Sequence, residues 1–269
     1  MLKAVVFDLD DTLLRDDLSI SDFTVRVFRK LHESGFFVIA ASGRAQLSMK
    51  PYVDQLGCVS VYISCNGAEI WNGADHTPIS LELFSADTAV EIARFGERHR
   101  CYMQVYEGNC FYFNRYGRYA ERYAASARLT GVYAGKLSGF IREPRNKILM
   151  IARETKIASM YTVARLLFEG KASVTCSKPF YLEFNPVNAT KGKALQTAAE
   201  YLGISPGEII AFGDSLNDLS MLQTAGKAVT VSNGWEQIRP WCDDICGSNN
   251  QDGPARYMND HYLNGEVSS

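Results

Sequence analysis

An apolar run near the start of the chain ends abruptly in acidic residues. Ala4 to Phe7 are apolar, and Asp8, Asp10 and Thr12 follow at alternate positions. The apolar run predicts a strand that is buried on both faces, as in a parallel sheet. Ligand sites in open α/β sheets lie beyond the carboxyl ends of the strands, and close carboxylates raise one another's pKa unless a cation intervenes. The pattern predicts a metal and catalytic site, with an acidic turn of no function as the alternative.

A hydroxyl and a glycine follow the second predicted strand, Phe36 to Ala41. Ser42 and Gly43 stand where a helix is expected to begin. The Ser42 hydroxyl and backbone N–H groups can bind an anion there, and the helix dipole favours negative charge. These residues predict a phosphate-binding turn, although a serine that only caps the helix fits the same pattern.

A second acidic turn, Gly213 to Asp218, follows another predicted buried strand. Asp214 can supply a further hard carboxylate to a cation, and Mg²⁺ prefers oxygen ligands in an octahedron that keeps several waters. Asn217 can reach a phosphate or a bound water, and Asp218 can act from behind the residues that hold the metal. The spacing predicts that this turn completes the site begun by Asp8.

A lysine opens the helix predicted from Lys191 to Leu202. The dipole makes a positive charge unfavourable at a helix N-terminus, so the position indicates a function for this side chain. Lys191 precedes Gly192, and Lys193 is the alternative two residues later. A lysine in contact with solvent alone is the third interpretation.

Together these segments resemble the motifs of the haloacid dehalogenase-like phosphohydrolases, in the Cof-type subclass with an inserted α+β cap of type C2B. D-x-D-x-T is similar to the first motif, Ser42-Gly43-Arg44 to the second, Lys191-Gly192 to the start of the corresponding helix, and G-D-x-x-N-D to the fourth motif. Asn66-Gly67 and the segment Asn249 to Gly253 also stand where this subclass often has N-G and N-x-x-D-G. Asp11 departs from the pattern, since glycine is common at that variable position.

The resemblance implies a phosphatase that works through a phosphoaspartyl intermediate. In it Asp8 is the nucleophile, and Asp10 is the acid that protonates a leaving alcohol and the base that activates water. Such an acid indicates a phosphatase more than a phosphonatase or a dehalogenase. The implied cofactor is Mg²⁺, held by Asp8, Asp10 and Asp214, with Asp218 behind them. The implied phosphate-binding residues are Leu9, Thr12, Ser42, Gly43, Lys191 and Asn217.

The leaving group is less well defined than the reaction. By resemblance, the substrates are small phosphorylated metabolites, such as sugar phosphates or phosphorylated cofactor precursors. The candidates for contacts to them are Arg44, Asn66, Gly67, Tyr106 and Glu107. For each of these residues, packing or exposure alone is the competing interpretation.

The elements that position these residues form an α/β chain with one interruption. Strands and helices alternate up to about residue 82 and again from residue 187, which predicts a Rossmann-like parallel-sheet core over residues 1–82 and 187–269. Between them, paired strand-like runs and two helices predict an inserted α+β domain over residues 83–186. By resemblance this insert is a C2B-type cap, which excludes water and selects the leaving group.

Composition limits the class of protein. The 269 residues are 46% hydrophobic and 22% charged, as in globular proteins, and the net charge of −2 indicates neither a nucleic-acid nor an acidic-membrane partner. No apolar run approaches the roughly 18 to 20 residues that span a bilayer. The start of the chain does not resemble a signal peptide, and seven scattered cysteines favour reduced thiols. We expect a cytoplasmic protein, as a monomer or a small homo-oligomer.

Two other functions compete with the phosphatase. A phosphomutase on the same core would return the phosphoryl group to its substrate, and it needs a cap that retains the intermediate. A non-catalytic phosphate-binding or signalling module, such as a receiver-like domain, also gathers acids, a hydroxyl and a lysine at strand ends. A receiver-like domain places its phosphorylated aspartate after the third strand, where this chain has Ser64-Cys65-Asn66.

Overall fold

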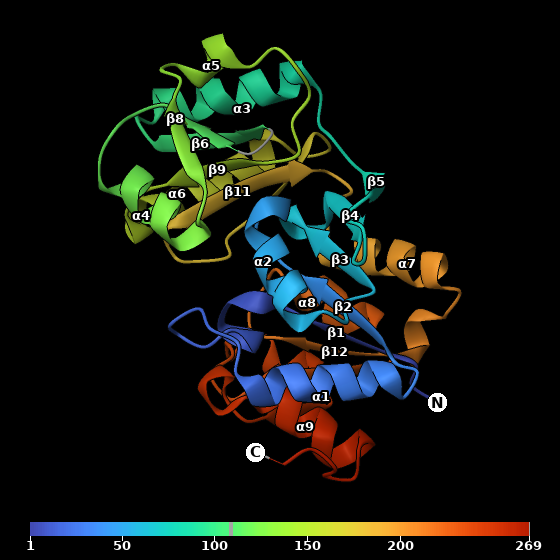
Figure 1. Ribbon diagram of the computed structural model, residues 1–269. Coiled ribbons are helices and arrows are strands. Elements are labelled where there is room, and N and C mark those ends of the chain that lie inside the picture. Colours follow the sequence, from blue (N-terminus) through green and yellow to red (C-terminus); the bar gives the residue numbers. More distant parts are fainter. Residues whose placement is uncertain (108–109, 269) are drawn as a thin grey trace. The chain divides into compact units, whose positions relative to one another are not determined.

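The computed structural model describes residues 1–107 and 110–268 and divides the chain into two compact units (Figure 1). The core unit comprises Met1–Gly43, Met49–Ser80 and the chain from Thr190 onward. The inserted unit comprises Leu81–Ala189 and the short segment Arg44–Ser48. It thus contains residues 83–186 and extends slightly beyond them on either side. Residues 108 and 109, in the turn predicted between two strands, lie outside the described residues.

The core unit is built on a mostly parallel sheet. Its strands are β1 (Ala4–Phe7), β2 (Phe37–Ala41), β3 (Val61–Ser64), β4 (Glu69–Asn72), β5 (Pro78–Leu81), β12 (Ile209–Gly213), β13 (Lys227–Val231) and β14 (Asp244–Cys246). Among the described residues the sheet order is β14-β13-β12-β1-β2-β3-β4-β5. β1 is parallel to both of its neighbours, β2 and β12, whereas β3 and β4 are antiparallel. The predicted parallel α/β core is confirmed, and β4, β5 and β14 are additions to the predicted strands.

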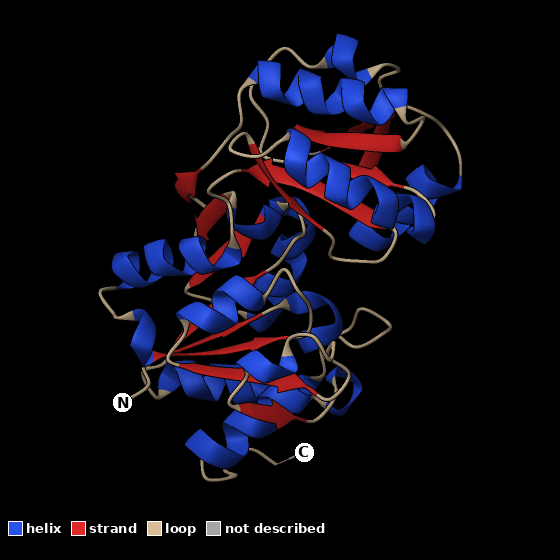
Figure 2. Cartoon of the chain, turned by 180° about the vertical axis from the view of Figure 1, so that it is seen from behind, coloured by secondary structure: helices blue, strands red, loops and turns tan. Residues whose placement is uncertain are grey.

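Neighbouring residues of β1 point into opposite layers of the core unit. The helices of this unit are α1 (Asp22–Glu33), α2 (Gln46–Leu56), α7 (Lys191–Leu202), α8 (Leu219–Thr224) and α9 (Gly253–Tyr262). Val5 and Phe7 pack in an apolar cluster with α1, α2 and α9, and Ala4 and Val6 pack in another with α7 and α8. Figure 2 shows helices on both faces of the core sheet. All four β1 side chains are buried, which explains an apolar run without alternation.

The inserted unit has its own sheet and apolar core. Its strands are β6 (Tyr102–Glu107), β7 (Cys110–Phe113), β8 (Thr130–Tyr133), β9 (Ile148–Ile151), β10 (Ala172–Thr175) and β11 (Tyr181–Pro186). Its helices are α3 (Ala86–Arg98), α4 (Arg118–Ala127), α5 (Leu137–Phe140) and α6 (Glu154–Leu167). The described strands run in the order β10-β11-β9-β6-β7-β8, and the pair β7 and β8 is parallel. Met103, Val105, Ile148 and Met150 pack with α3 and α6, which forms the predicted α+β arrangement.

Several elements of the two units differ from the predicted ones. β8 was not expected, because all four of its residues are exposed and no apolar alternation marks it. α6 begins at Glu154 instead of Ser159, and an acidic residue in the first turn suits the helix dipole. α8 begins at Leu219 instead of Leu216, because the preceding residues form a turn closed by the Asp218 N–H on the Ser215 carbonyl.

Helix length and cysteine state bear on two further expectations. Of the helices within residues 1–107 and 110–268, none is long and apolar enough to cross a bilayer. The seven cysteines all lie within the described residues, and none of them takes part in a disulfide there. Burial raises the pKa of Cys58 to about 11, so this thiol stays protonated at neutral pH.

Candidate active site

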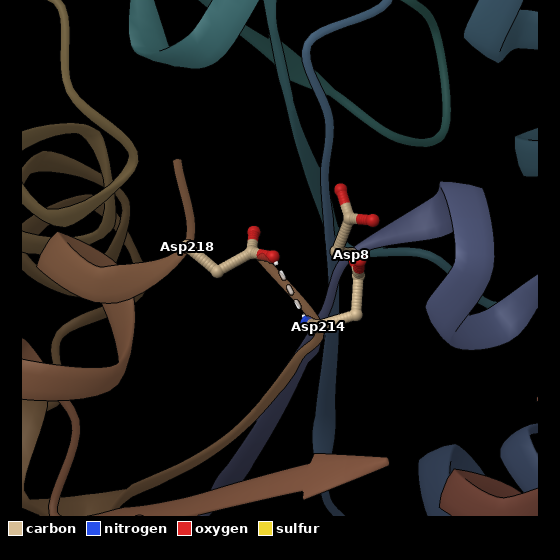
Figure 3. A group of neighbouring side chains, drawn as sticks. All are labelled: Asp8, Asp214 and Asp218. Atoms are coloured by element: carbon tan, nitrogen blue, oxygen red, sulfur yellow. Dashed lines mark hydrogen bonds between the residues drawn. The ribbon is translucent and has the colours of Figure 1, made fainter. Parts of the chain in front are cut away.

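Three carboxylates meet where β1 and β12 end. The two strands are adjacent and parallel, with Phe7 opposite Phe212, so Asp8 and Asp214 leave the sheet at the same edge. Asp218 joins them from the turn before α8 (Figure 3). One oxygen from each carboxylate lies within 4.8 Å of the others. The three residues are only 4%, 6% and 0% exposed, so the structure brings both predicted acidic turns into one buried group.

The Lys191 ammonium lies among these carboxylates. Its Nζ is 2.5 Å from Asp8 Oδ1 and 2.5 Å from Asp218 Oδ1, and the residue is completely buried. α7 begins here because the Thr190 hydroxyl accepts the backbone N–H of Lys193 and caps the helix. Lys193 itself is exposed. Of the two candidate lysines, Lys191 is the one that reaches the acids.

Burial makes the negative charge of this group costly. It raises the pKa of Asp8 well above its usual range, while Lys191 opposes the shift and the neighbouring carboxylates add to it. Burial and the Asp218 charge raise the pKa of Asp214 to about 8. For Lys191, burial lowers the pKa, but Asp218 and Asp8 outweigh it and hold the pKa above its usual value. One ammonium faces three buried carboxylates, and a further cation would relieve the remaining repulsion.

Both carboxylate oxygens of Asp218 accept hydrogen bonds from neighbouring residues of the site. Its Oδ1 accepts Lys191, and its Oδ2 accepts the backbone N–H groups of residues 214 and 215, each at 3.1 Å. The turn that brings Asp218 back against residues 214 and 215 requires Gly213, because a Cβ at that position would lie 2.6 Å from the Asp218 Cβ. The other two carboxylates, Asp8 and Asp214, suit Mg²⁺, which is held by one or two carboxylates and keeps several waters.

The chain after β1 turns sharply over Leu9–Leu13, with Asp11 at a φ of +59°. The Thr12 hydroxyl donates to Asp214 Oδ1 at 3.1 Å and so ties this turn to the second acidic strand end. The Leu9 side chain is buried in the core, and Asp10 is half-buried. The turn therefore presents Asp8 and Asp10 close together on one short, braced segment.

Three polar segments from neighbouring strand ends join next to the acids. The Asn66 N–H donates to the Ser42 carbonyl at 3.0 Å, and Asn217 Nδ2 donates to Asn66 Oδ1 at 3.1 Å. Gly43 lies against the same Asn66 side chain. The structure thus gathers the predicted residues that follow β2, β3 and β12 in one hydrogen-bonded network.

The backbone after β3 adopts an uncommon conformation. Cys65, Asn66 and Gly67 all have positive φ values, of 50°, 56° and 105°. Gly67 is required here, because a Cβ would lie 2.4 Å from the Thr190 carbonyl oxygen at the start of α7. Positive φ at non-glycine residues costs free energy and is found at functional sites. The segment brings the Asn66 network against the residue that precedes Lys191.

Two of the residues predicted to contact the leaving group, Tyr106 and Glu107, belong to the inserted unit. The Tyr106 hydroxyl lies 2.6 Å from that of Tyr123, and Glu107 accepts Arg145 at 2.7 Å. Both side chains have partners within their own unit. Arg44 lies in the short segment grouped with that unit and donates to a neighbouring serine at 3.0 Å. A contact of these residues with a ligand stays a prediction.

Four polar residues brace the acidic turn, and the sequence pattern singles out only two of them. Arg15 forms a two-pronged ion pair with Asp252, which is 6% exposed. Asn249 donates to the carbonyl of the residue before Arg15 at 3.0 Å, and Asn233 donates to the Asp11 carbonyl at 2.8 Å. Asn249 and Asp252 belong to the N-x-x-D-G segment. No local signal marks Arg15 or Asn233, whose partners lie 237 and 222 residues away.

Known proteins resemble this chain in sequence and in fold. The family model of the haloacid dehalogenase-like hydrolases matches residues 5–258. The chain is 27% identical to the 5-amino-6-(5-phospho-D-ribitylamino)uracil phosphatase YitU of Bacillus subtilis, over 96% of this chain and 97% of that protein. It is 27% identical to an HMP-PP phosphatase of Serratia proteamaculans, over 98% of this chain and 96% of that protein. A haloacid dehalogenase-like hydrolase from Bacteroides thetaiotaomicron has the same fold, with a TM-score of 0.88 at 24% identity over 97% of this chain and 100% of that one.

Replacing Lys191 is expected to destabilise the protein strongly. Lys191→Met leaves the Asp8 and Asp218 carboxylates buried without their cation, which should lower the free energy of unfolding by about 3–5 kcal/mol. Lys193→Met, an exposed position on the same helix, is the matched control and should cost less than about 0.5 kcal/mol. Urea unfolding at neutral pH without divalent metal measures both. Equal losses in the two variants would contradict the arrangement.

Proposed function

This chain belongs to the haloacid dehalogenase-like hydrolases, the family predicted from its motifs, and on that premise we propose that it is a phosphatase of small phosphorylated metabolites. The observation that carries the proposal is the Asp8 carboxylate, buried at the end of β1 beside Lys191 and Asp214. A carboxylate held by an ammonium on one oxygen, close to a second carboxylate that can share a metal, is suited to attack phosphorus.

In the proposed mechanism Asp8 is the nucleophile and Asp10 is the acid and base. Asp8 Oδ2 attacks phosphorus while Lys191 holds Oδ1, so an oxygen–phosphorus bond forms and the bond to the leaving oxygen breaks. Asp10 gives its proton to that oxygen, and the product departs as an alcohol. Asp10 then takes a proton from the water that attacks phosphorus. This step releases inorganic phosphate and restores the Asp8 carboxylate.

We propose Mg²⁺ as the cofactor. Asp8 and Asp214 would hold it with carboxylate oxygens, and Asp10 with its backbone carbonyl. When bound, it offsets the repulsion between Asp8 and the phosphoryl group and stabilises the charge that develops on the phosphoryl oxygens. Thr12 and Asp218 keep Asp214 in place through the bonds described above.

The phosphoryl oxygens require hydrogen-bond donors that hold the group in line. The proposed donors are Ser42, Gly43, Lys191 and Asn217. Two further residues were predicted to bind phosphate, Leu9 and Thr12. Leu9 can do so only with backbone groups, because its side chain is buried in the core. Thr12 donates its hydroxyl proton to Asp214 and is left with its backbone N–H for the same purpose.

The leaving group is proposed to be a small metabolite that the inserted unit selects as a cap. Two relatives are named as phosphatases of 5-amino-6-(5-phospho-D-ribitylamino)uracil and of HMP-PP. Those names favour a phosphorylated metabolite over a phosphoprotein. A phosphomutase on the same core is the alternative, and no observation of the inserted unit favours it. A receiver-like phosphate-binding module is disfavoured, because it would place its phosphorylated aspartate after the third strand, where this chain has Ser64-Cys65-Asn66.

Turnover of a panel of phosphorylated metabolites tests the function. With Mg²⁺ the wild-type protein should release phosphate from at least one member, and chelation of the metal should stop the release. Asp8→Asn removes the nucleophile and should lower kcat by at least about a thousand-fold. Asp11→Asn is the matched control, because Asp11 is exposed and asparagine tolerates its positive φ. This control should retain activity.

Two outcomes of the panel would overturn the proposal. One is the absence of phosphate release from every member, and the other is full activity in Asp8→Asn. Isomerised sugar phosphate without free phosphate would identify the phosphomutase instead.

The role of Asp10 has its own kinetic signature. Asp10→Asn removes the proton donor and the base but keeps the nucleophile, so kcat for alkyl phosphates should fall by about 10²–10⁴. The leaving group of p-nitrophenyl phosphate needs no proton, so that ester should still give a rapid burst of one nitrophenolate per protein, followed by slow turnover. Stopped-flow absorbance measures the burst. Equal loss for both classes of ester, without a burst, would remove Asp10 from this role.

A further inference from the structure

A cavity of about 650 Å³ lies within the inserted unit. It is lined by α4, by the ends of β9 and β11, and by the chain from Ala152 to Thr155 that opens α6. Figure 1 shows where these elements lie in the inserted unit. A volume of this size is typical of sites for small ligands. The lining consists of residues 118–181 only and contains none of the residues proposed above for catalysis.

The side chains around this cavity carry an excess of positive charge. Its cations are Arg118, Arg122, Arg153 and Lys178, and Glu154 is the acidic residue in the described lining. Within residues 1–107 and 110–268, none of the four cations takes part in an ion pair, while three other cations of the unit are paired with glutamates. Unpaired cations around a concave surface raise the local potential and favour an anionic ligand.

The first turn of α6 supplies backbone hydrogen-bond donors to the same wall, although the Glu154 carboxylate offsets part of the helix dipole there. This helix runs from Glu154 to Leu167, and its N-cap residue, Arg153, makes no capping bond with its side chain. Arg153, Glu154 and Thr155 all line the cavity. The backbone N–H groups of a first helical turn have no partner inside the helix, and the dipole places a partial positive charge on them.

Aromatic rings form another part of the lining. Tyr119 carries the Arg118 guanidinium over its face, at 5.2 Å from the ring centre. Phe180 and Tyr181 meet edge to face at 4.8 Å, and Phe180 is 38% exposed. Such rings offer faces and edges on which a flat ligand ring can stack. A bare phosphate or a polyol would leave this surface unused.

We propose that this cavity binds an organic anion that carries a flat aromatic ring. The anionic group, a phosphate or a carboxylate, meets Arg118, Arg122 and the start of α6, and the ring packs against Tyr119 and Phe180. The inference goes beyond the phosphatase function, and only the assignment of the cavity to a leaving group rests on that function. Two kinds of ligand have an anionic group and a flat ring of this sort: the leaving group of a substrate and a separate effector molecule.

Calorimetric titration of the full-length protein tests the site. Asp8→Asn without divalent metal serves as the background, so that no probe is hydrolysed. Adenosine monophosphate, which has both a ring and an anion, should bind to one site per chain. Ribose 5-phosphate lacks the ring and adenosine lacks the anion, so each should bind at least tenfold more weakly.

Two charge-reversal variants, one in the cavity and a matched one outside it, complete the test. Arg122→Glu on α4 should weaken binding of adenosine monophosphate at least tenfold. Arg94→Glu, an exposed arginine in the middle of α3, changes the net charge equally and should alter binding less than twofold. No binding of the nucleotide, equal weakening by both variants, or adenosine binding as tightly as the nucleotide would each overturn the proposal.

Inhibition of p-nitrophenyl phosphate hydrolysis by the same nucleotide distinguishes the two kinds of ligand. Competitive inhibition that Arg122→Glu relieves assigns the cavity to the leaving group. Binding that leaves the Michaelis constant unchanged assigns it to an effector.

Discussion

The candidate site depends on a single buried ammonium, that of Lys191. Three carboxylates are buried at one edge of the core sheet, and such charges are tolerated away from water only when they are paired and hydrogen-bonded. Lys191 binds two of them, Asp8 and Asp218. Its position requires α7 to begin at this residue, which the Thr190 cap ensures. The Gly192 N–H bonds the Ser220 hydroxyl of α8 at 3.0 Å and holds the two helices together at that point.

The parts that sequence predicts best are those set by local pattern. The apolar run before Asp8 specifies a strand buried on both faces, and parallel strands necessarily deliver their last residues to one edge. Asp8 and Asp214 therefore meet as predicted. The resemblance to the family favours Lys191 over Lys193, because Gly192 follows Lys191, but the strand pattern does not separate two lysines at the same helix start. The cap and the helical turn decide between them, since one lysine points to the acids and the other to solvent.

The parts that sequence misses depend on contacts between distant segments. Arg15 pairs with Asp252, 237 residues away, and neither side chain stands in a pattern that names the other. β8 lacks any apolar alternation, because its side chains are exposed. The cavity of the inserted unit arises only when α4, α6 and β11 are packed together. The sequence shows that the α4 segment is rich in tyrosine and arginine, but it does not show the cavity beside this helix.

The central claim is that the carboxylate held by Lys191 becomes covalently attached to phosphorus. Brief mixing of the wild-type protein with Mg²⁺ and a substrate, followed by acid quenching and reduction with borohydride, converts an aspartyl phosphate into homoserine. Mass spectrometry of the resulting peptides locates the change. Homoserine is expected at position 8 and at no other aspartate position. Turnover without modification of Asp8, or modification of another aspartate, would contradict it.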